Sequence, residues 1–485
     1  MESRGGCNRE LVLCVQVNAH GKAHRMKLLA FLLILMAIPV FFVMIRSERG
    51  YALGCFLLGF FPFCLNALNL DFAIINWVQW PGYAKGMVVT ILDSLSLAFL
   101  LHHRNTLTRL PFLALFIAYV LAIAISAFSS SIFTAAGFYV FQLLRVFALF
   151  VAVAAAVERP SGFKWLTYGL AWAAVLQGIV TISERAAGTF QADGTMAHQN
   201  MLGFMLHFVI LPLGALALAG DRRKVLLLAI VCALIAVALG ASRASIGFLV
   251  VGLSCLVALS LWRASSPRKW KIAAFGAIIA VLISPVAISG LEQRLTSTNL
   301  EGSSNERHAF EQAARLMIAD NPMGVGANHY VLAANVQGYS DRAGVIWNSS
   351  SRAAHVHQLY LLTAAEGGFL ALGALIALFV WPIVRGVRFA FERRRDMRGD
   401  VVLGSTIALA AAALHSFYEW IFVSYQAQYV FAITLGLMAG LIRQRANEVH
   451  RVDRRHGESW HLGAATPKRS ACEADQATQP RTPSR

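Results

Sequence analysis

Thirteen long apolar runs, separated by shorter polar gaps, constrain this chain more than any other feature of its sequence. The hydrocarbon core of a bilayer is about 30 Å thick, and a helix of about 20 apolar residues crosses it. Backbone groups in lipid must be hydrogen-bonded within their own segment unless a barrel forms, and no barrel-like alternation is visible. The sequence therefore predicts an all-α polytopic membrane protein of about 12–13 transmembrane helices. The runs cover 28–45, 51–68, 85–101, 111–128, 133–157, 164–182, 200–220, 224–241, 245–262, 271–290, 357–382, 402–424 and 427–443.

Composition excludes the other broad classes. Hydrophobic residues make up 57% of the chain and charged residues only 14%, whereas soluble proteins carry about 25% charged residues and disordered chains are poor in apolar residues. The formal net charge of +17 raises the question of a nucleic-acid partner. Lys and Arg lie mainly in the gaps and the C-terminal tail, however, and no zinc-finger, RNP or helix-turn-helix pattern is present, so we expect no nucleic-acid partner.

The basic gaps predict the orientation of the spans. Cytoplasmic loops of membrane proteins carry an excess of Lys and Arg, and the basic residues here recur in every second gap. A cytoplasmic C-terminus after thirteen spans puts the N-terminus outside, although 1–27 are mildly basic. Either the first two runs do not both cross, or the native start lies nearer Met26. The basic gaps contain Arg104 and Arg109, Arg159 and Lys164, residues 222–224, residues 263–271 and residues 385–398, and the series continues after Leu441.

This pattern divides the chain into five parts. An N-terminal segment (1–27) precedes ten transmembrane helices (28–290), a long loop on the outer side (291–356) and three further helices (357–443). The polar C-terminal part, 444–485, is predicted to be a flexible cytoplasmic tail. Its positive charge suits contact with anionic lipids.

The long loop is predicted to carry a short amphipathic helix. Ser303, followed three residues later by Glu306, fits a capping box. Apolar side chains then recur at helical spacing until Asn321 and Pro322 end the pattern, which predicts about 16 helical residues lying on the outer surface or over a cavity. The glycines that follow do not form a nucleotide-binding loop, because no G-x-x-x-x-G-K and no preceding strand is present. The apolar positions are Phe310, Ala313, Ala314, Met317 and Ile318.

Ionisable residues within apolar runs are costly in a membrane and mark function or structure. Asp93 and Arg145 fall near the middle of their runs, which predicts a buried ion pair that locks two helices together. Glu366 lies nine residues after His357, on the opposite face of a straight helix and about 13 Å deeper. A structural role for Glu366 is therefore favoured over orientation of the histidine.

Further polar residues lie near the outer ends of the spans. His415 and Glu419, at i and i+4, share one helical face, and whether they line a cavity stays open. Arg185 and His198 precede the seventh span and are secondary candidates for substrate contacts. Arg185 has two other options, pairing with Glu184 or binding a lipid headgroup.

Two outer arginines suit a diphosphate. Arg243 lies in the turn Gly-Ala-Ser-Arg-Ala-Ser between two spans, and Arg307 lies in the first turn of the amphipathic helix. Guanidinium groups bind phosphate oxygens through charge and bidentate geometry. Snorkelling toward lipid headgroups is the alternative for either arginine alone. His357 lies at the outer mouth of its span, with Tyr360 one turn further on the same face.

These motifs resemble those of the bacterial O-antigen ligase and polysaccharide polymerase superfamily. The resemblance extends over about 200–420, with Gln358 as a departure where the family often has Asn or Ser. It implies a helical membrane glycosyltransferase that transfers a glycan from undecaprenyl diphosphate to a sugar hydroxyl at the periplasmic face, without metal or other cofactor. The matching pieces are Ser242-Arg243, Glu306-Arg307 with Asn321-Pro322-Met323-Gly324-Val325-Gly326, and His357-Gln358-Leu359-Tyr360-Leu361 with Glu366-Gly367-Gly368.

The resemblance also implies roles for individual residues. Arg243 and Arg307 would bind the diphosphate and stabilise the charge that grows on it as the glycosidic bond breaks. His357 would be the catalytic histidine, since imidazole titrates near neutrality and accepts a hydroxyl proton. Direct attack in one step would invert the anomeric centre. His355 and His357 form an H-x-H, but no further ligand set and no D-x-D accompany it, so no metal site is expected.

Three alternatives remain open at this point. The motifs serve both a ligase, which transfers a finished glycan to lipid A core, and a polymerase, which extends a carrier-linked glycan; a polymerase for surface or extracellular polysaccharide is slightly favoured. A transporter or flippase would show matching halves with broken helices, and no internal repeat is evident. A protein O-oligosaccharyltransferase would use the same donor. All readings place the chain in the bacterial inner membrane.

Overall fold

The computed structural model describes residues 31–104, 110–297, 300–392 and 396–463. Eight helices in this part are long and apolar enough to cross a membrane, and four shorter apolar helices accompany them. The prediction of an all-α polytopic membrane protein is confirmed. The helices are Phe31–Met44, α2 (Glu48–Phe60), α3 (Ile91–His102), α4 (Leu113–Ser126), α5 (Phe133–Ala156), α6 (Pro160–Ala186), α7 (Gln199–Ala219), α8 (Lys224–Leu239), α9 (Arg243–Arg263), α10 (Pro267–Ser297), α11 (Leu300–Asp320), α12 (Tyr330–Val336), α13 (Tyr339–Arg342), α14 (Ser349–Arg352), α15 (Leu359–Glu392), α16 (Met397–His415) and α17 (Tyr425–Gly463).

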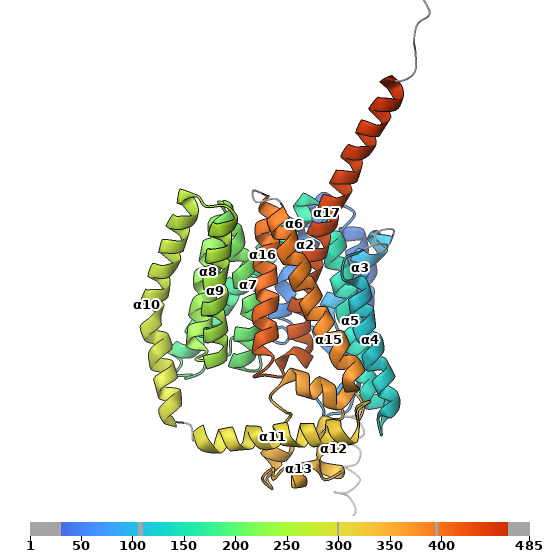
Figure 1. The fold of residues 1–485 in the computed structure, drawn as a ribbon, viewed down its shortest axis with the longest axis vertical. Helices are drawn as coiled ribbons and strands as arrows, with labels where there is room; N and C mark the ends of the chain where they lie inside the picture. The colour runs from blue at the N-terminus through green and yellow to red at the C-terminus, as the bar shows by residue number, and fades with distance from the viewer. Residues whose placement is uncertain (1–30, 105–109, 298–299, 393–395, 464–485) are drawn as a thin grey trace, which may run out of the picture. The chain divides into compact units, whose positions relative to one another are not determined.

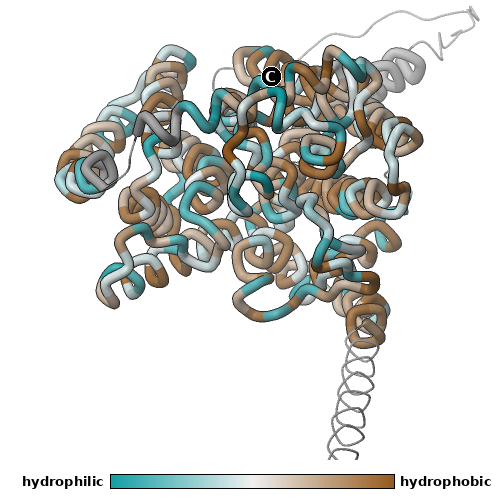
Figure 2. The backbone as a smooth tube through the Cα atoms, turned by 90° about the horizontal axis from the view of Figure 1, so that it is seen from below, coloured by the Kyte–Doolittle hydropathy of each residue, from teal (hydrophilic) through white to brown (hydrophobic). Residues whose placement is uncertain are grey.

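The helices of the bundle differ in how much of their surface is buried. Up to Arg443 the chain forms one unit, in which α7 and the apolar part of α17 are almost wholly buried, whereas α10 buries none of its apolar segment. The spanning helices run side by side, and α11 lies across one end of them (Figure 1). Figure 2 views the unit from that end, where hydrophilic stretches cross in front of mainly hydrophobic helices. This end carries the long loop between α10 and α15.

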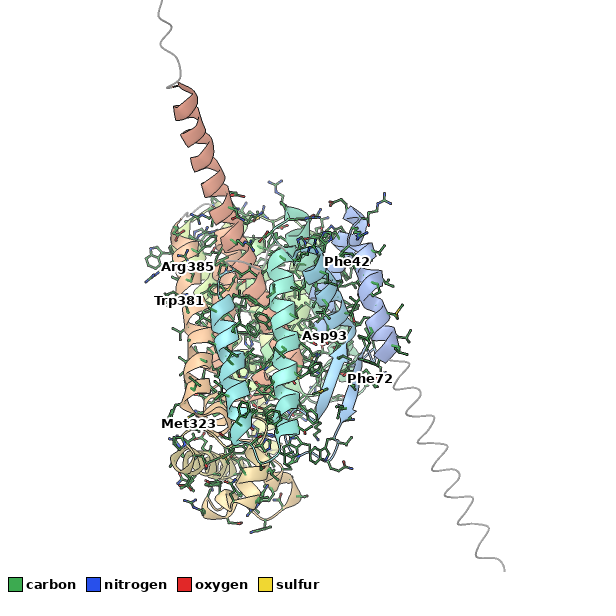
Figure 3. The ribbon with its side chains drawn as sticks, turned by 90° about the vertical axis from the view of Figure 1, so that its right-hand side faces the viewer. Phe42, Phe72, Asp93, Met323, Trp381 and Arg385 are labelled. Atoms are coloured by element: carbon green, nitrogen blue, oxygen red, sulfur yellow. The ribbon has the colours of Figure 1, made fainter. Side chains whose placement is uncertain are left out.

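A two-stranded hairpin was not predicted. Strands β1 (Asp71–Asn76) and β2 (Gly86–Thr90) pair antiparallel, and Figure 3 shows them beside the helices. The apolar run 85–101 is therefore not one span, because its first residues include the β-branched Val88, Val89 and Thr90, which favour a strand. Only α3 remains helical, and Thr90 caps it.

The hairpin moves Asp93 from the predicted middle of a helix to the first turn of α3. The predicted ion pair is present: Arg145 Nε donates to Asp93 Oδ2 over 2.8 Å, and Tyr429 donates to the other carboxylate oxygen over 2.7 Å. Both charged side chains are buried. Because a buried charge needs partners, this cluster ties α3, α5 and α17 together, in keeping with the structural role favoured above.

The long loop forms a layer of short helices. α10 continues to Ser297 and α11 already includes Leu300, so Ser303 lies inside α11 and the predicted capping box is wrong as a helix start. The predicted stop is confirmed, because α11 ends at Asp320 directly before Asn321-Pro322. Its apolar face packs on the bundle through Phe310, Ala313, Ala314 and Met317, all of them buried.

The predicted flexible tail is wrong at its start. α17 remains helical to Gly463, in a second unit that begins at Gln444. Residues 444–456 contain neither Gly nor Pro and include four Arg, so nothing in them breaks a helix. The remainder, 464–485, lies outside the described residues, as does the N-terminal segment up to residue 30.

Candidate functional site

A cavity of about 480 Å³ opens where α7, α9 and α11 meet the segment after α16. It combines charged, polar and apolar side chains from parts of the chain that are far apart in sequence. Its charged members are two arginines and one glutamate, which suits a ligand with an anionic group and a polar one. The lining residues are Asn200, Ser242, Arg243, Ala244, Gly247, Phe248, Val251, Arg307, Tyr418 and Glu419.

Arg243 lies at the start of α9 because Ser242 caps that helix. The Ser242 hydroxyl accepts the backbone N–H of Ser245, and Ala241 before it adopts a positive φ of 49° that turns the chain. The N-terminus of a helix carries a partial positive charge. The same residue position thus brings a guanidinium and a helix N-terminus to the cavity.

Arg307 reaches the same cavity from α11. The structure thus brings both predicted arginines to one cavity. Within the described part of the chain, neither guanidinium makes an ion pair or a hydrogen bond, and both residues are exposed. Two unpaired cations beside one cavity are a strong attraction for an anion.

His357 does not line the cavity, but it contacts Glu419, which does. Its Nδ1 lies 3.5 Å from Glu419 Oε2, and Asn200 Nδ2 donates to the other oxygen of Glu419 over 2.7 Å. The Glu419 side chain is only 8% exposed, whereas that of His357 is 32% exposed. This separation makes an ion-pair contact and not a hydrogen bond, because His357 Nδ1 has no hydrogen-bond partner among the described residues.

His415 and Glu419 do not share a helical face, contrary to the prediction. α16 ends at His415, because the next carbonyl, that of Ser416, accepts the backbone N–H of Leu359 over 2.9 Å. Glu419 follows a turn and lines the cavity, whereas His415 is fully buried. Its ring lies 5.4 Å from that of Phe248, behind the cavity wall.

Tyr360 does not line the cavity either. Its hydroxyl donates to the carbonyl of Ala413 over 2.7 Å, which fastens the start of α15 to the end of α16. The same junction holds His357, just before α15, next to Glu419, just after α16. Tyr360 therefore contributes to the site by position and not by contact with a ligand.

Arg185 and His198 both lie outside the cavity lining. Arg185 donates to the carbonyl of Phe190 over 3.0 Å, and its neighbour Glu184 accepts the backbone N–H of Gly194 over 2.9 Å. His198 caps α7, accepting the N–H of Asn200 over 3.1 Å. His198 thereby fixes the turn from which Asn200 reaches the cavity.

Glu366 fastens the loop that follows α11. The carboxylate accepts the backbone N–H groups of Asn328 and Tyr330 over 2.9 and 2.8 Å, and the hydroxyl of Tyr83 over 2.6 Å. Burial, and next the Glu366 carboxylate, raise the pKa of Tyr83 well above its usual range, so the phenol keeps its proton and donates. These contacts provide a physical basis for the predicted structural role.

Glycines in two motifs allow their backbones to meet. The N–H of Val325 donates to the carbonyl of Ala365 over 2.9 Å. A Cβ on Gly324 would lie 2.3 Å from the carbonyl oxygen of Glu366, and Gly368 interrupts α15 with a φ of 67°. The straight helix assumed for α15 is therefore wrong, because only glycine fits this close approach without strain.

His355, the other histidine of the H-x-H, is buried beside the site. The His355 ring stacks on Trp420 at 4.6 Å between centroids. Burial, then the charges of His357 and Lys85, lower the pKa of His355 to about 3. His355 is therefore neutral at physiological pH and does not serve as a titrating base there. Among the residues with assigned positions, no three His, Cys, Asp or Glu side chains are grouped so as to hold a metal ion.

Sequence reasoning missed several residues of this site. Asn200 lines the cavity and binds Glu419, and its only sequence signal is a polar side chain at the outer start of an apolar run. Phe248 and Tyr418 also line it, but aromatic residues near the ends of spans are common at membrane interfaces and carry no specific signal. Tyr83 belongs to the hairpin, which was itself not predicted.

The comparisons agree with the motifs. Residues 228–376 match the family model described as O-antigen ligase, and no curated protein matches the chain. The matched segment contains Arg243, Arg307 and His357, whereas Asn200 and Glu419 lie outside it. The resemblance to the O-antigen ligase and polysaccharide polymerase superfamily is confirmed, and the match supports an O-antigen ligase-type membrane glycosyltransferase.

Proposed function

We propose that this protein transfers a glycan from undecaprenyl diphosphate to the hydroxyl of an acceptor sugar, at the periplasmic face of the bacterial inner membrane. The observation that carries the proposal is the cavity lined by Arg243, Arg307 and Glu419: the two arginines are unpaired within the described residues, and the Glu419 carboxylate contacts His357. Such a cavity pairs cations for a diphosphate with a base for a hydroxyl. The family match supports the same reaction class.

The arginines act on the leaving group. When the bond between the anomeric carbon and the diphosphate oxygen breaks, negative charge grows on that oxygen. Arg243, Arg307 and the N-terminus of α9 stabilise this charge more in the transition state than in the ground state, and this difference accelerates the reaction. The diphosphate departs on its lipid.

The apolar side of the cavity suits the lipid. Ala244, Gly247, Phe248 and Val251 follow one face of α9 away from Arg243, and eight residues of helix extend about 12 Å. A polyprenyl chain whose diphosphate is bound at Arg243 has an apolar path along this face into the membrane.

The basic gaps support the proposed orientation. Arg263 and Lys269, at the far end of α9 and the start of α10, belong to a gap assigned to the cytoplasm. The cavity is at the other end of α9, next to α11. The donor headgroup is therefore bound on the periplasmic side, and the C-terminus is cytoplasmic.

Replacing His357 with alanine should lower the rate of transfer by about 10²-fold or more, because a positioned general base contributes about 10²–10⁴-fold. The measurement uses purified protein in detergent with a carrier-linked glycan, and it follows new glycosidic bonds. His102→Ala, at the end of α3, is the matched control. Detergent leaves no compartments, so transfer there also distinguishes this activity from that of a flippase. Wild-type rates in His357→Ala would discard the assignment.

Glu419 is expected to stabilise His357 once it has taken the proton. Glu419→Gln should lower kcat by about 10²-fold without raising the donor KM, because removal of a negative charge from the cavity does not weaken binding of an anionic donor. Steady-state kinetics at several donor concentrations separate the two constants. A raised donor KM with unchanged kcat would instead assign Glu419 to donor binding.

The acceptor decides between the two family activities. Donor and leaving group are the same for both, so this cavity serves a polymerase, which we favour, as well as a ligase. In a deletion strain, single repeat units that remain on the carrier lipid would indicate a polymerase. Full-length polymer accumulating on the carrier would indicate a ligase.

A further inference from the structure

A second cavity, of about 600 Å³, lies along α11 and is distinct from the first. We call it the α11 groove. Its polar lining comes from one stripe of the helix that includes positions i, i+3 and i+7, nearly opposite the face with Phe310 and Met317 that packs on the bundle. The polar members are Asn305, His308, Glu311, Gln312 and Arg315, and Ala343 and Gly344 form the facing rim.

The groove offers neutral hydrogen-bonding groups without internal partners. In the described structure, the side chains of Asn305, His308 and Gln312 make no hydrogen bonds, whereas Glu311 and Arg315 form an ion pair at 3.8 Å. Amide and imidazole side chains provide both donors and acceptors. A lining with balanced charges and both kinds of group suits a ligand with many hydroxyls better than an anion or an apolar surface.

An exposed tryptophan stands beside the groove. Trp347 is 80% exposed, and it follows the rim residue Gly344 by only three positions, which limits their separation to about 11 Å. The Arg352 guanidinium lies 4.0 Å from its ring centroid and is held in turn by Asp341 over 2.7 Å. One face of the indole is thus supported by a fixed cation, while most of the ring remains open to solvent.

The segment that carries Trp347, residues 347–352, is hydrogen-bonded to α11. The hydroxyl of Ser351 donates to the carboxylate of Glu306 on α11, and Asn348 caps the short helix α14 that contains Ser351. Trp347 therefore stands in a defined position relative to the groove. A rigid aromatic face beside neutral polar groups matches a sugar ring, whose C–H groups carry the partial positive charge that the face of a π-system attracts.

We propose that the α11 groove and Trp347 bind the saccharide chain of the substrate or product where it extends from the cavity. The inference rests on the proposed function. Arg307 lines the cavity and the next residue, His308, lines the groove, so a glycan whose diphosphate is bound at Arg307 has the groove within its reach. From Asn305 to Arg315 the groove extends about 15 Å along the helix.

Fluorescence in lipid nanodiscs tests the binding without requiring transfer. The difference in emission between wild type and Trp347→Phe isolates one of the 10 tryptophans. The probe is the oligosaccharide released by mild acid from the lipid-linked glycans of the host cell. We expect iodide to quench the difference signal and the oligosaccharide to protect it. Absence of protection would overturn the proposal, and so would quenching by lipids brominated in their acyl chains, which would place the ring in the membrane.

Kinetics supply the second arm. Trp347→Ala and Gln312→Ala should each raise the donor KM about tenfold and leave kcat within about twofold, as expected for lost substrate binding alone. Trp270→Phe, an exposed tryptophan on α10, is the control. An unchanged donor KM in both groove variants would refute the groove while leaving the proposed transfer intact. Oligosaccharide protection in a protein without transferase activity would refute the proposed function and leave the groove as a glycan-binding site.

Discussion

Alanine at both Arg243 and Arg307 should reduce glycan transfer by about 10⁴-fold or more. Removal of a single preorganised group that stabilises developing negative charge costs about 10²–10³-fold, and the two guanidiniums line one cavity without a partner in the described part of the chain. Each single variant should therefore lose about 10²–10³-fold. Initial rates of glycosidic bond formation with purified protein and a carrier-linked glycan measure the effect.

Lysine variants test whether charge alone is sufficient, and a third arginine provides the control. Arg243→Lys and Arg307→Lys keep the charge but lose the planar fork that binds two phosphate oxygens, so their rates should fall between those of wild type and the alanine variants. Arg342→Ala, which removes an exposed arginine paired with Asp320 on the same outer layer, should retain transfer. Equal rates in wild type and the double alanine variant would show that the two arginines of this cavity do not contribute to transfer.

The helices could be predicted from sequence because lipid imposes a strict length and hydropathy on each of them. Arg243 and Arg307 could be singled out because a cation at the outer boundary is conspicuous between apolar runs. The residues 85–90 show the limit of this reasoning. Val88, Val89 and Thr90 are as apolar or β-branched as many residues in membrane helices, and only pairing with Asp71–Asn76 makes them a strand.

Contacts between residues far apart in the sequence could not be predicted from it. Glu419 reaches His357 because Leu359 and Tyr360 bind the end of α16, which ends that helix before Glu419. The apolar run continues through this point, so hydropathy alone predicts no helix end there. The i, i+4 relation of Glu419 to His415 failed for the same reason, although both residues could be recognised as polar groups near the outer surface.

The break in α15 is another tertiary effect. The sequence Glu366-Gly367-Gly368 lies within an apolar run and predicts continuous helix. The approach of the loop around Gly324, whose Cβ would lie 2.3 Å from a carbonyl oxygen of α15, requires the interruption at Gly368. Glu366 then binds this loop and not the solvent or a second charge, so its role depends on a partner 36–38 residues away.

Glu366→Ala should destabilise the protein by at least about 2 kcal/mol, because two buried donors and one partly buried donor lose their acceptor and each unsatisfied buried donor costs about 1–3 kcal/mol. The donors are the N–H groups of Asn328 and Tyr330 and the hydroxyl of Tyr83. Transfer should fall as well, since the Tyr330 hydroxyl binds the carbonyl of Phe310 on α11, one turn from Arg307. Thermal unfolding in detergent and transfer rates measured on the same preparation report both effects.

Two further variants distinguish the loss of the Glu366 hydrogen bonds from the loss of a negative charge. Glu366→Gln keeps the size of the side chain and one acceptor oxygen, so it should lose less stability than Glu366→Ala. Glu392→Ala removes a glutamate from the same helix whose ion pair with Arg385 is half-exposed, and exposed pairs contribute only about 0–1 kcal/mol. If Glu392→Ala and Glu366→Ala lowered the unfolding temperature equally, the buried hydrogen bonds of Glu366 would not be what holds the loop to α15. A Glu366→Ala protein that stayed stable but transferred slowly would instead place the effect on the position of α11 and Arg307.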